Sequence, residues 1–346
     1  MGTPKPITIV GGGLAGLTLG IALRQRGVPV EIWEAAHYPR HRVCGEFISG
    51  RGLATLERLN LRQLTLRAGA VSARTVAFFS RRIASRTQTL PSPALCASRF
   101  VLDDALAGEF RRLGGDLREG ERWRETFSRE GVVRATGRHA KPTENGWRWF
   151  GLKTHARGVS LVADLEMHVS PNSYVGLCRL ADGDVNVCGL FRRRAGVEAA
   201  RHGRELLCGE AGSLLRERLD GAVMKEDSFC SVAGLTPKSR RAVAQDDCCV
   251  GDAITMIPPM TGNGMSMAFE SAEIAIEPLV DWCGGRISWR QSHQTIACRC
   301  DAAFNRRLAW AEKLQALVLM PASQGPLVWL VSRSDWSWRL GFKRTR

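Results

Sequence analysis

The sequence predicts an α/β fold built on a doubly wound parallel sheet, with a second sheet and a helical C-terminal region attached to it. Two patterns support this: a strand, glycine turn, helix and strand over residues 7–34, and a strand, glycine loop and helix over residues 250–268. In doubly wound folds such turns gather at the carboxyl ends of the strands, where ligands bind. A chain of 346 residues is long enough for two lobes with a substantial core.

The first pattern is a dinucleotide fingerprint in its expected setting. Residues 7–10 form a short β-branched run, typical of a strand buried on both faces. Gly11, Gly13 and Gly16 follow in G-x-G-x-x-G spacing, and an apolar helical pattern then leads to a strand that ends at Glu34. This context makes dinucleotide binding the favoured interpretation, and a glycine-rich turn without a ligand is the alternative.

Each residue of the turn has a physical role in that interpretation. Gly11 permits the tight turn, Gly13 lets a pyrophosphate approach the backbone, and Gly16 lets helix and strand pack closely. The backbone amides of Leu14 and Ala15 lie at the helix start, where the helix dipole favours negative charge.

Glu34 indicates which nucleotide binds. It follows Gly16 by eighteen residues, about the offset at which a carboxylate accepts a hydrogen bond from a ribose hydroxyl. A carboxylate there repels a 2′-phosphate, so we expect FAD or NAD rather than NADP.

The second pattern adds a second set of cofactor contacts. A short apolar strand ends at Asp252, whose carboxylate could bind a ribityl or sugar hydroxyl. A proline-rich loop and a helix start follow, and their amides and dipole would stabilise negative charge on a bound ring. The expected contacts here are Asp252, Pro259, Gly262, Asn263, Gly264 and Met265.

The net charge of +15 is unusual, and 42 of the 49 basic residues are Arg. This charge indicates an anionic partner, such as a phosphorylated substrate, the phosphates of a cofactor or an anionic membrane. A solvated Arg-rich surface without such a partner is the alternative. Nucleic acid is not expected, because the sequence has no basic arm, zinc spacing or helix-turn-helix pattern.

The eleven cysteines do not form metal-binding spacings, so we expect no metal site. The N-terminal apolar segment belongs to the nucleotide fold rather than to a signal peptide. Reduced thiols and a cytoplasmic location follow from this interpretation.

No run of 18 apolar residues is present, so no membrane-spanning helix is expected. The C-terminal segment contains Trp336 and Trp338 before a basic end, Lys343 and Arg344. Peripheral contact with an anionic membrane and a solvated tail are equally compatible with that pattern. The sequence does not indicate an oligomeric state.

The ordered motifs together resemble one known family. The chain is similar to the FAD-dependent oxidoreductases of the p-hydroxybenzoate-hydroxylase-like superfamily, most closely the geranylgeranyl-reductase-like branch, over nearly its whole length. The motifs that carry the resemblance are the glycine turn with Glu34, Cys44-Gly45-Glu46, Ser98-Arg99 with Leu102-Asp103, Ala135-Thr136-Gly137, and Gly251-Asp252-Ala253 through Gly264.

The resemblance implies FAD as the cofactor, with further contacts from Arg42 and Arg99. It also implies a discontinuous domain organisation in which a substrate-binding sheet covers the substrate cavity. The expected FAD-binding segments are residues 1–70, 96–148 and 230–280, the substrate-binding sheet is 71–95 and 149–229, and the C-terminal helical region is 281–346. Within these segments, residues 159–167 read as a strand and residues 196–219 as a helix.

The resemblance implies a flavin-dependent redox enzyme acting on a lipophilic, possibly anionic molecule. The leading expectation is reduction of a carbon–carbon double bond by hydride transfer from reduced flavin. The alternatives are a monooxygenase acting through a flavin C4a-hydroperoxide, giving hydroxylation or epoxidation, and a non-catalytic FAD-binding module. Halogenation is set aside, because flavin halogenases need a lysine in the first third of the chain and none lies between Lys5 and Lys141.

Four residues are candidates for the chemistry or the substrate contact. Cys44 could position the substrate or supply a proton, or it could be a small buried residue. Glu46 could be a general acid if desolvated, or it could pair with a neighbour such as Arg42. Tyr174 and His155 could face the substrate, or they could be structural residues of the sheet. Because only one dinucleotide fingerprint is present, NAD(P)H would bind transiently or a partner reductase would deliver electrons.

Overall fold

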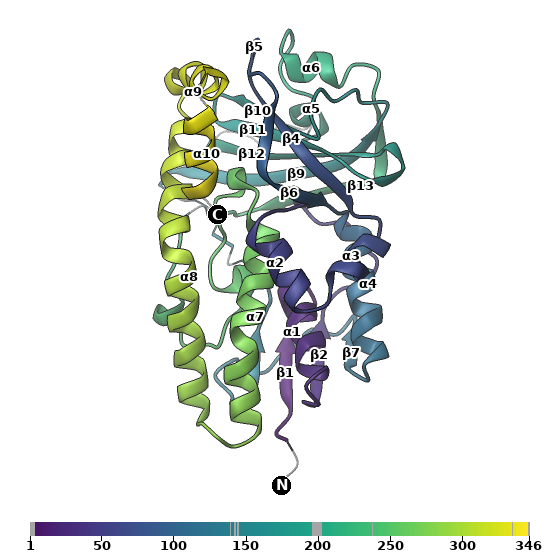
Figure 1. Ribbon diagram of the computed structural model, residues 1–346, viewed down its shortest axis with the longest axis vertical. Helices are drawn as coiled ribbons and strands as arrows, with labels where there is room; N and C mark the ends of the chain where they lie inside the picture. Colours follow the sequence, from purple (N-terminus) through teal and green to yellow (C-terminus); the bar gives the residue numbers. More distant parts are fainter. Residues whose placement is uncertain are drawn as a thin grey trace.

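The computed structural model describes residues 4–138, 140–141, 143, 145–195, 203–236, 238–333 and 335–344. Two lobes are stacked along the long axis of the molecule, one around a small parallel sheet and one around a large curved sheet (Figure 1). The expected α/β class, with a Rossmann-like sheet, a second sheet and C-terminal helices, is confirmed.

The small-sheet lobe contains four parallel strands in the order β7-β2-β1-β8. An additional parallel bridge between Arg134 and Cys249 brings the second glycine loop to the edge of this sheet. Helix α1 packs against α4 and α7, and its buried face is almost entirely apolar. The elements are β1 (Ile7–Val10), α1 (Leu14–Arg24), β2 (Val30–Glu34), α4 (Arg99–Arg112), β7 (Asp116–Glu119), β8 (Val132–Arg134) and α7 (Gly264–Cys283).

The large sheet has the order β13-β9-β12-β11-β10-β4-β6-β3, with β5 paired to β4. A tight turn at Asp182 and Gly183 joins β11 to β12, and both residues have positive φ. The strands are β3 (Phe47–Ile48), β4 (Val71–Ser80), β5 (Ile83–Ala84), β6 (Gln88–Cys96), β9 (Trp147–Arg157), β10 (Leu165–Ser170), β11 (Ser173–Arg179), β12 (Val185–Arg194) and β13 (Val223–Ala233).

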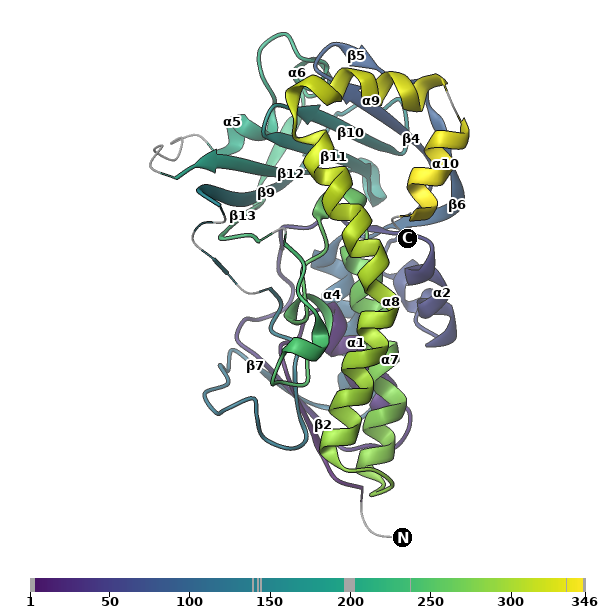
Figure 2. The same ribbon diagram turned by 90° about the vertical axis from the view of Figure 1, so that its left-hand side faces the viewer.

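Three C-terminal helices cover one side of the molecule. Helix α8 (Trp289–Val318) runs along both lobes, α9 (Pro321–Arg333) crosses the end of the large sheet, and α10 (Asp335–Arg344) returns beside β6 (Figure 2). None of the helices in the described part of the chain is long and apolar enough to cross a membrane. The remaining helices are α2 (Arg51–Arg58), α3 (Arg62–Arg67), α5 (Gly203–Leu207) and α6 (Leu214–Arg218).

Three local expectations need correction. The expected boundary at residue 230 falls within β13, which stays paired with β9 to Ala233. The strand expected over 159–167 begins only at Leu165. Residues 196–202 of the expected helix 196–219 lie outside the described residues. The rest forms two short helices, because Gly209 and Gly212 adopt positive φ between them.

Candidate functional site

The glycine turn after β1 is shaped as its spacing predicts. Gly11 has φ +111°, and a side chain there would collide with the carbonyl oxygen of Ala135 on the neighbouring strand. Gly16 packs directly against the backbone of Gly11, so helix α1 lies close to the strand. A Cβ atom on Gly13 would meet no atom within 4 Å, because this residue borders open space. The start of α1 has no side-chain cap, so its first amides are available to a ligand.

That open space is a cavity of about 660 Å³, which we call the cofactor cavity. Asn263 does not line it, because its side-chain oxygen accepts a hydrogen bond from Ser49 Oγ at 3.3 Å. Gly16 does not line it either. The expected cofactor contacts that do line it are Gly11, Gly13, Leu14, Ala15, Glu34, Arg42, Arg99, Asp252, Pro259, Gly262, Gly264 and Met265.

Glu34 lies at the end of β2, beside the glycine turn. Its carboxylate accepts hydrogen bonds from the backbone amides of Gly12 (2.8 Å) and Ala36 (3.0 Å), and Arg40 lies 2.8 Å away. Burial alone would raise the pKa of Glu34, but Arg40 and these amides lower it below its ordinary value. The side chain is therefore an ionised acceptor, as a ribose contact requires.

Two arginines contribute buried guanidinium N–H donors to the wall of the cofactor cavity, and one of them, Arg42, also lies 3.8 Å from the Glu34 carboxylate. The Nε atoms of Arg42 and Arg138 are buried, and neither has a hydrogen-bond partner among the described residues. Burial lowers the pKa of both guanidinium groups. Buried donors without partners are costly, so an anionic group in this cavity would satisfy them. Together with the free amides of α1, these arginines fit the pyrophosphate of a dinucleotide.

Arg99 begins α4 and also lines the cofactor cavity. Its Nε and one terminal nitrogen each lie 2.6 Å from an oxygen of Asp103, one helical turn further on. Burial would lower the pKa of Arg99, but Asp103 raises it above the ordinary value. The guanidinium is therefore held in place by a side chain of the same helix.

The loop that contains Cys44 separates the cofactor cavity from a second cavity. The amide of Glu46 donates to Cys44 Sγ at 3.4 Å, and Asn186 donates to the carbonyl oxygen of Cys44 at 3.0 Å. Burial raises the pKa of the Cys44 thiol, and the nearby Arg99 offsets this only in part. At neutral pH the thiol is therefore protonated.

Glu46 of this loop forms a largely buried ionic cluster with His41, Lys153 and His155, and both His41 and Glu46 also line the cofactor cavity. Glu46 Oε2 lies 2.8 Å from His155 Nε2, and Glu46 Oε1 lies 3.3 Å from Lys153 Nζ. Lys153 Nζ is also 2.9 Å from His41 Nδ1. Burial would raise the pKa of Glu46, but His155 and Lys153 lower it. This geometry suits an ionised group that anchors the loop rather than a general acid.

The sequence did not reveal the whole cluster. His155, expected on the substrate side, lines neither cavity and instead bonds to Glu46. Lys153 was not singled out, and it too lines neither cavity. Six consecutive residues of β9, Gly151 to Ala156, are buried, so this strand is covered on both faces. The polar run Lys153-Thr154-His155 gives no sign of this in the sequence.

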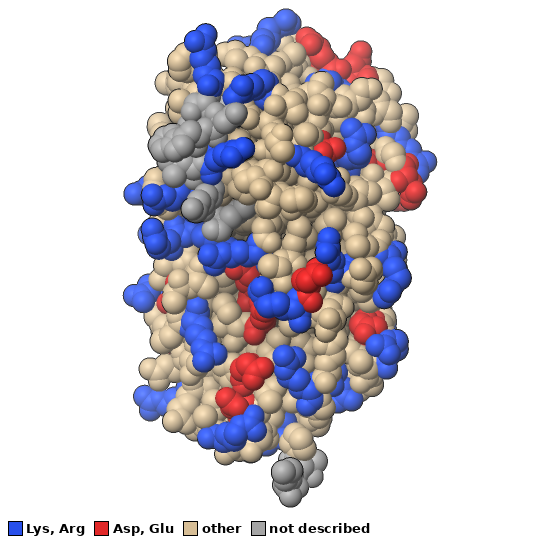
Figure 3. All heavy atoms as spheres, in the orientation of Figure 1, with Lys and Arg blue, Asp and Glu red and all other residues tan. Residues whose placement is uncertain are grey.

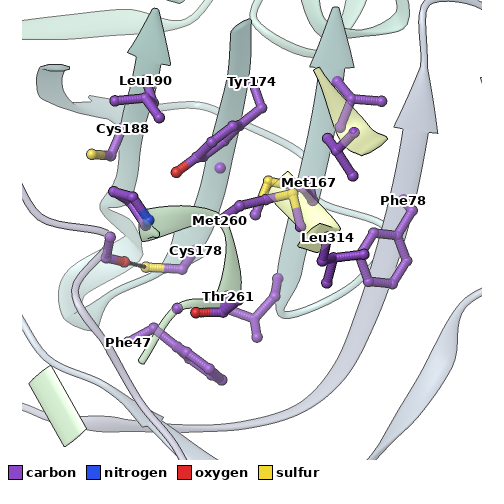
Figure 4. A pocket seen from close by; sticks show the side chains of 18 of the residues that line it. Phe47, Phe78, Met167, Tyr174, Cys178, Cys188, Leu190, Met260, Thr261 and Leu314 are labelled. Carbon is purple, nitrogen blue, oxygen red and sulfur yellow. Dashed lines mark hydrogen bonds between the residues drawn. The ribbon is translucent and has the colours of Figure 1, made fainter. Parts of the chain in front are cut away.

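The second cavity measures about 390 Å³, and its lining is predominantly apolar; we call it the apolar cavity. Tyr174 projects from β11 into this space, and Met167, Leu190 and Met260 surround it (Figure 4). The Tyr174 hydroxyl is buried and has no hydrogen-bond partner among the described residues, and burial raises its pKa. Residues that line both cavities form a shared wall, namely Val43, Cys44, Gly45, Phe47, Arg138, Val232, Asp252, Met256, Pro259 and Gly262.

Comparison with known proteins agrees with this architecture. The NAD(P)-binding Rossmann-like domain family matches residues 9–45, the segment that contains the glycine turn and Glu34. No curated protein sequence matches the chain significantly.

Solved structures of flavin enzymes match nearly the full length at low identity. A triple mutant of the flavin-dependent brominase Bmp2 is 17% identical with a TM-score of 0.73, and the match covers 97% of each chain. PqsL, a probable FAD-dependent monooxygenase from Pseudomonas aeruginosa, is 15% identical with a TM-score of 0.70, covering 94% of this chain and 100% of PqsL.

A geranylgeranyl bacteriochlorophyll reductase-like protein from Thermoplasma acidophilum is 16% identical with a TM-score of 0.74, covering 99% of this chain and 97% of that chain. The chain thus shares its fold with these proteins, which are a flavin-dependent brominase, a probable FAD-dependent monooxygenase and a reductase-like protein.

Proposed function

We propose that this protein is an FAD-dependent oxidoreductase acting on a lipophilic small molecule. One observation supports the proposal most strongly: a cavity suited to a dinucleotide and an apolar cavity meet at the shared wall that contains Cys44. A cofactor in the first would lie next to a substrate in the second. Low-identity neighbours with the same fold are flavin enzymes, which adds to this support.

In this proposal the residues of the chain bind and orient the cofactor and the substrate, and they do not perform the redox step themselves. FAD, when bound, supplies the redox chemistry. Glu34 would bind the ribose, and Arg42, Arg138 and the amides of α1 would bind the phosphates. The apolar cavity excludes water from the reacting centre, which strengthens the polar contacts inside it.

For the reaction itself we favour reduction of a carbon–carbon double bond. That reaction needs a proton as well as a hydride, and the protonated Cys44 thiol lies in the shared wall where both would be required. Oxygen insertion is the second candidate, and the shared fold with PqsL favours it. NAD(P)H as a transient visitor, or a partner reductase, would supply the electrons.

The substrate would be mainly apolar with one polar group. The lining offers few polar side chains, but the buried Tyr174 hydroxyl points into the cavity without a partner. A hydroxyl or carboxylate on the substrate would satisfy it and orient the molecule.

The test is a product analysis of the purified, FAD-loaded protein with prenylated and polyene lipids. Under anaerobic chemical reduction, a product that gains two hydrogens supports the reductase. With NADH or NADPH, a reductase and air, a product that gains one oxygen supports the monooxygenase. Bound flavin that turns over with no lipid under either condition would favour a non-catalytic FAD-binding module. A chain that purifies without flavin and does not take it up would overturn the proposal itself.

A further inference from the structure

The apolar cavity is lined by exposed residues at a second place, away from the shared wall. There it is lined by α9 and α10, where Leu330 is 44% exposed and Gly341 is also exposed to solvent. Of the other described residues that line the apolar cavity, only Gly45 in the shared wall is also exposed to solvent. A substrate that does not pass through the cofactor cavity would therefore enter beside α9 and α10.

The surface around this opening is apolar. Leu317 and Met320 at the end of α8 are 42% and 47% exposed, and Trp329 on α9 is 55% exposed. Trp329, Leu330 and Arg333 follow at helical spacing, so they share one face of α9. We call these five residues the cap surface. Helices α8 and α9, which carry the cap surface, and the neighbouring α10 lie on one side of the molecule (Figure 2).

The same region is basic. The Arg333 guanidinium lies 5.1 Å from the ring centre of Trp329, and Arg339 is exposed on α10. Residues 313–344 contain five basic residues and one acidic residue, Asp335. Elsewhere basic side chains are dispersed, as the face in Figure 3 shows. An indole beside a guanidinium suits the interface of an anionic bilayer.

We infer that the cap surface docks on an anionic phospholipid membrane and that the substrate enters the apolar cavity from the bilayer beside α9 and α10. Apolar side chains would enter the interface while the arginines contact lipid phosphates. An acidic protein would match the charge, but it would not use an opening into an apolar cavity. The entry route rests on the proposed function, whereas docking itself does not.

The experiment is vesicle flotation of the full-length, FAD-loaded protein. Vesicles of phosphatidylcholine alone are compared with vesicles that also contain phosphatidylglycerol. We expect binding only to the latter, and weaker binding as salt is added. Arg333→Gln with Arg339→Gln should lower the partition coefficient about 25-fold, since each cation near an anionic surface contributes about five-fold. Met320→Ser with Trp329→Ser should also weaken binding.

Two control variants separate docking from general effects. Val162→Ser with Val223→Ser removes apolar residues that are 55% and 68% exposed elsewhere, and should leave binding unchanged. Arg124→Gln with Arg290→Gln removes two exposed charges outside this region and should lower the partition coefficient far less. Flavin content and circular dichroism establish that each variant is folded.

Three results would overturn the inference: no binding to anionic vesicles, equal binding to both vesicle types, or cap variants that bind like the unaltered protein. A dimer that dissociates in the Met320 and Trp329 variant would assign the surface to a second copy instead. Flotation needs no turnover, so a failure of the proposed reaction leaves this result interpretable. Activity on detergent-solubilised substrate without vesicle binding would refute docking alone.

Discussion

Lys153 Nζ lies 3.3 Å from Oε1 of Glu46, and neither side chain is exposed to solvent. Glu46 also has φ +55°, which side chains rarely adopt. Its carboxylate therefore holds a strained loop residue in place and, with it, the neighbouring Cys44 in the shared wall. The cluster orders the loop that separates the two cavities.

Replacing Lys153 with Met should destabilise the protein by about 3–5 kcal/mol, because the Glu46 carboxylate would remain buried without its ammonium partner. Urea unfolding of the FAD-loaded protein at pH 7 measures this change. Arg62→Met is the matched control, since Arg62 and Glu57 form an exposed pair at 3.0 Å. The Arg62→Met substitution should lower the free energy of unfolding by only about 0–1 kcal/mol. Equal losses in the two variants would refute an energetic role for burial here.

His41 should make stability depend on pH in a defined window. Burial lowers its pKa from 6.5 to about 4, and Lys153 adds to this effect. Between these values the unfolded chain binds more protons than the folded one, so stability falls as the pH falls. The contribution of His41 to the free energy of unfolding is complete above about pH 6.5 and is lost progressively as the pH falls towards about 4. His41→Gln keeps an acceptor for Lys153 but cannot titrate, so its urea midpoint should change less between pH 7 and 5. If the urea midpoints of the two proteins changed equally between pH 7 and 5, His41 would not be the source of the pH dependence.

Replacing two glycines of the turn with alanine should have different effects, one on stability and the other on flavin affinity. Gly11→Ala places a side chain against the Ala135 carbonyl at φ +111°, so it should lower the thermal midpoint strongly. Gly13→Ala meets no protein atom within 4 Å, so the protein should fold normally. Its methyl group would nevertheless occupy space that a pyrophosphate needs, and flavin affinity should fall at least ten-fold. Fluorescence titration of the apoprotein with FAD measures this, and undiminished affinity would argue against the assigned phosphate position.

Cys44 and Cys298 should differ in reactivity and importance. Iodoacetamide at neutral pH should label the exposed Cys298 and spare the half-buried Cys44, because burial raises the pKa of the Cys44 thiol. If Cys44 supplies the proton, Cys44→Ala should lower kcat at least ten-fold with normal flavin content. Cys298→Ala should leave kcat unchanged. Peptide mass spectrometry and steady-state kinetics give the two readouts, and full activity of Cys44→Ala would exclude Cys44 as the proton donor.

Tyr174→Phe should affect stability and substrate binding in opposite directions. Removing a buried hydroxyl without a described partner should leave the thermal midpoint unchanged or raise it. If the substrate's polar group reaches this hydroxyl, KM should rise about ten-fold, which corresponds to about 1.4 kcal/mol. An unchanged KM would mean that the substrate does not contact the hydroxyl.

The local motifs of the nucleotide fold were predictable because their constraints act over short distances. Gly11, Gly13 and Glu34 lie within one strand-helix-strand unit, so their spacing alone predicts the geometry that the structure shows.

The buried ionic cluster could not be predicted, because its members come from a loop and from a distant strand. Lys153 and Glu46 are 107 positions apart in the sequence, and a lysine in a strand is normally placed towards solvent. The sequence likewise gives no sign that the Arg138 Nε atom is buried without a hydrogen-bond partner among the described residues. The continuation of β13 past residue 230 was obscured by its polar central residues and the irregular pairing between Lys225 and Cys230.

The shared wall also constrains how this fold can acquire new specificities. A substitution at Val43, Cys44, Gly45 or Phe47 alters the surroundings of both cavities at once. Changes that alter substrate choice while preserving flavin affinity should therefore accumulate at the opposite end, around Leu327, Leu330 and Phe342. Directed evolution of this protein would be most productive there, where a larger or differently shaped ligand can be accommodated without disturbing the redox centre.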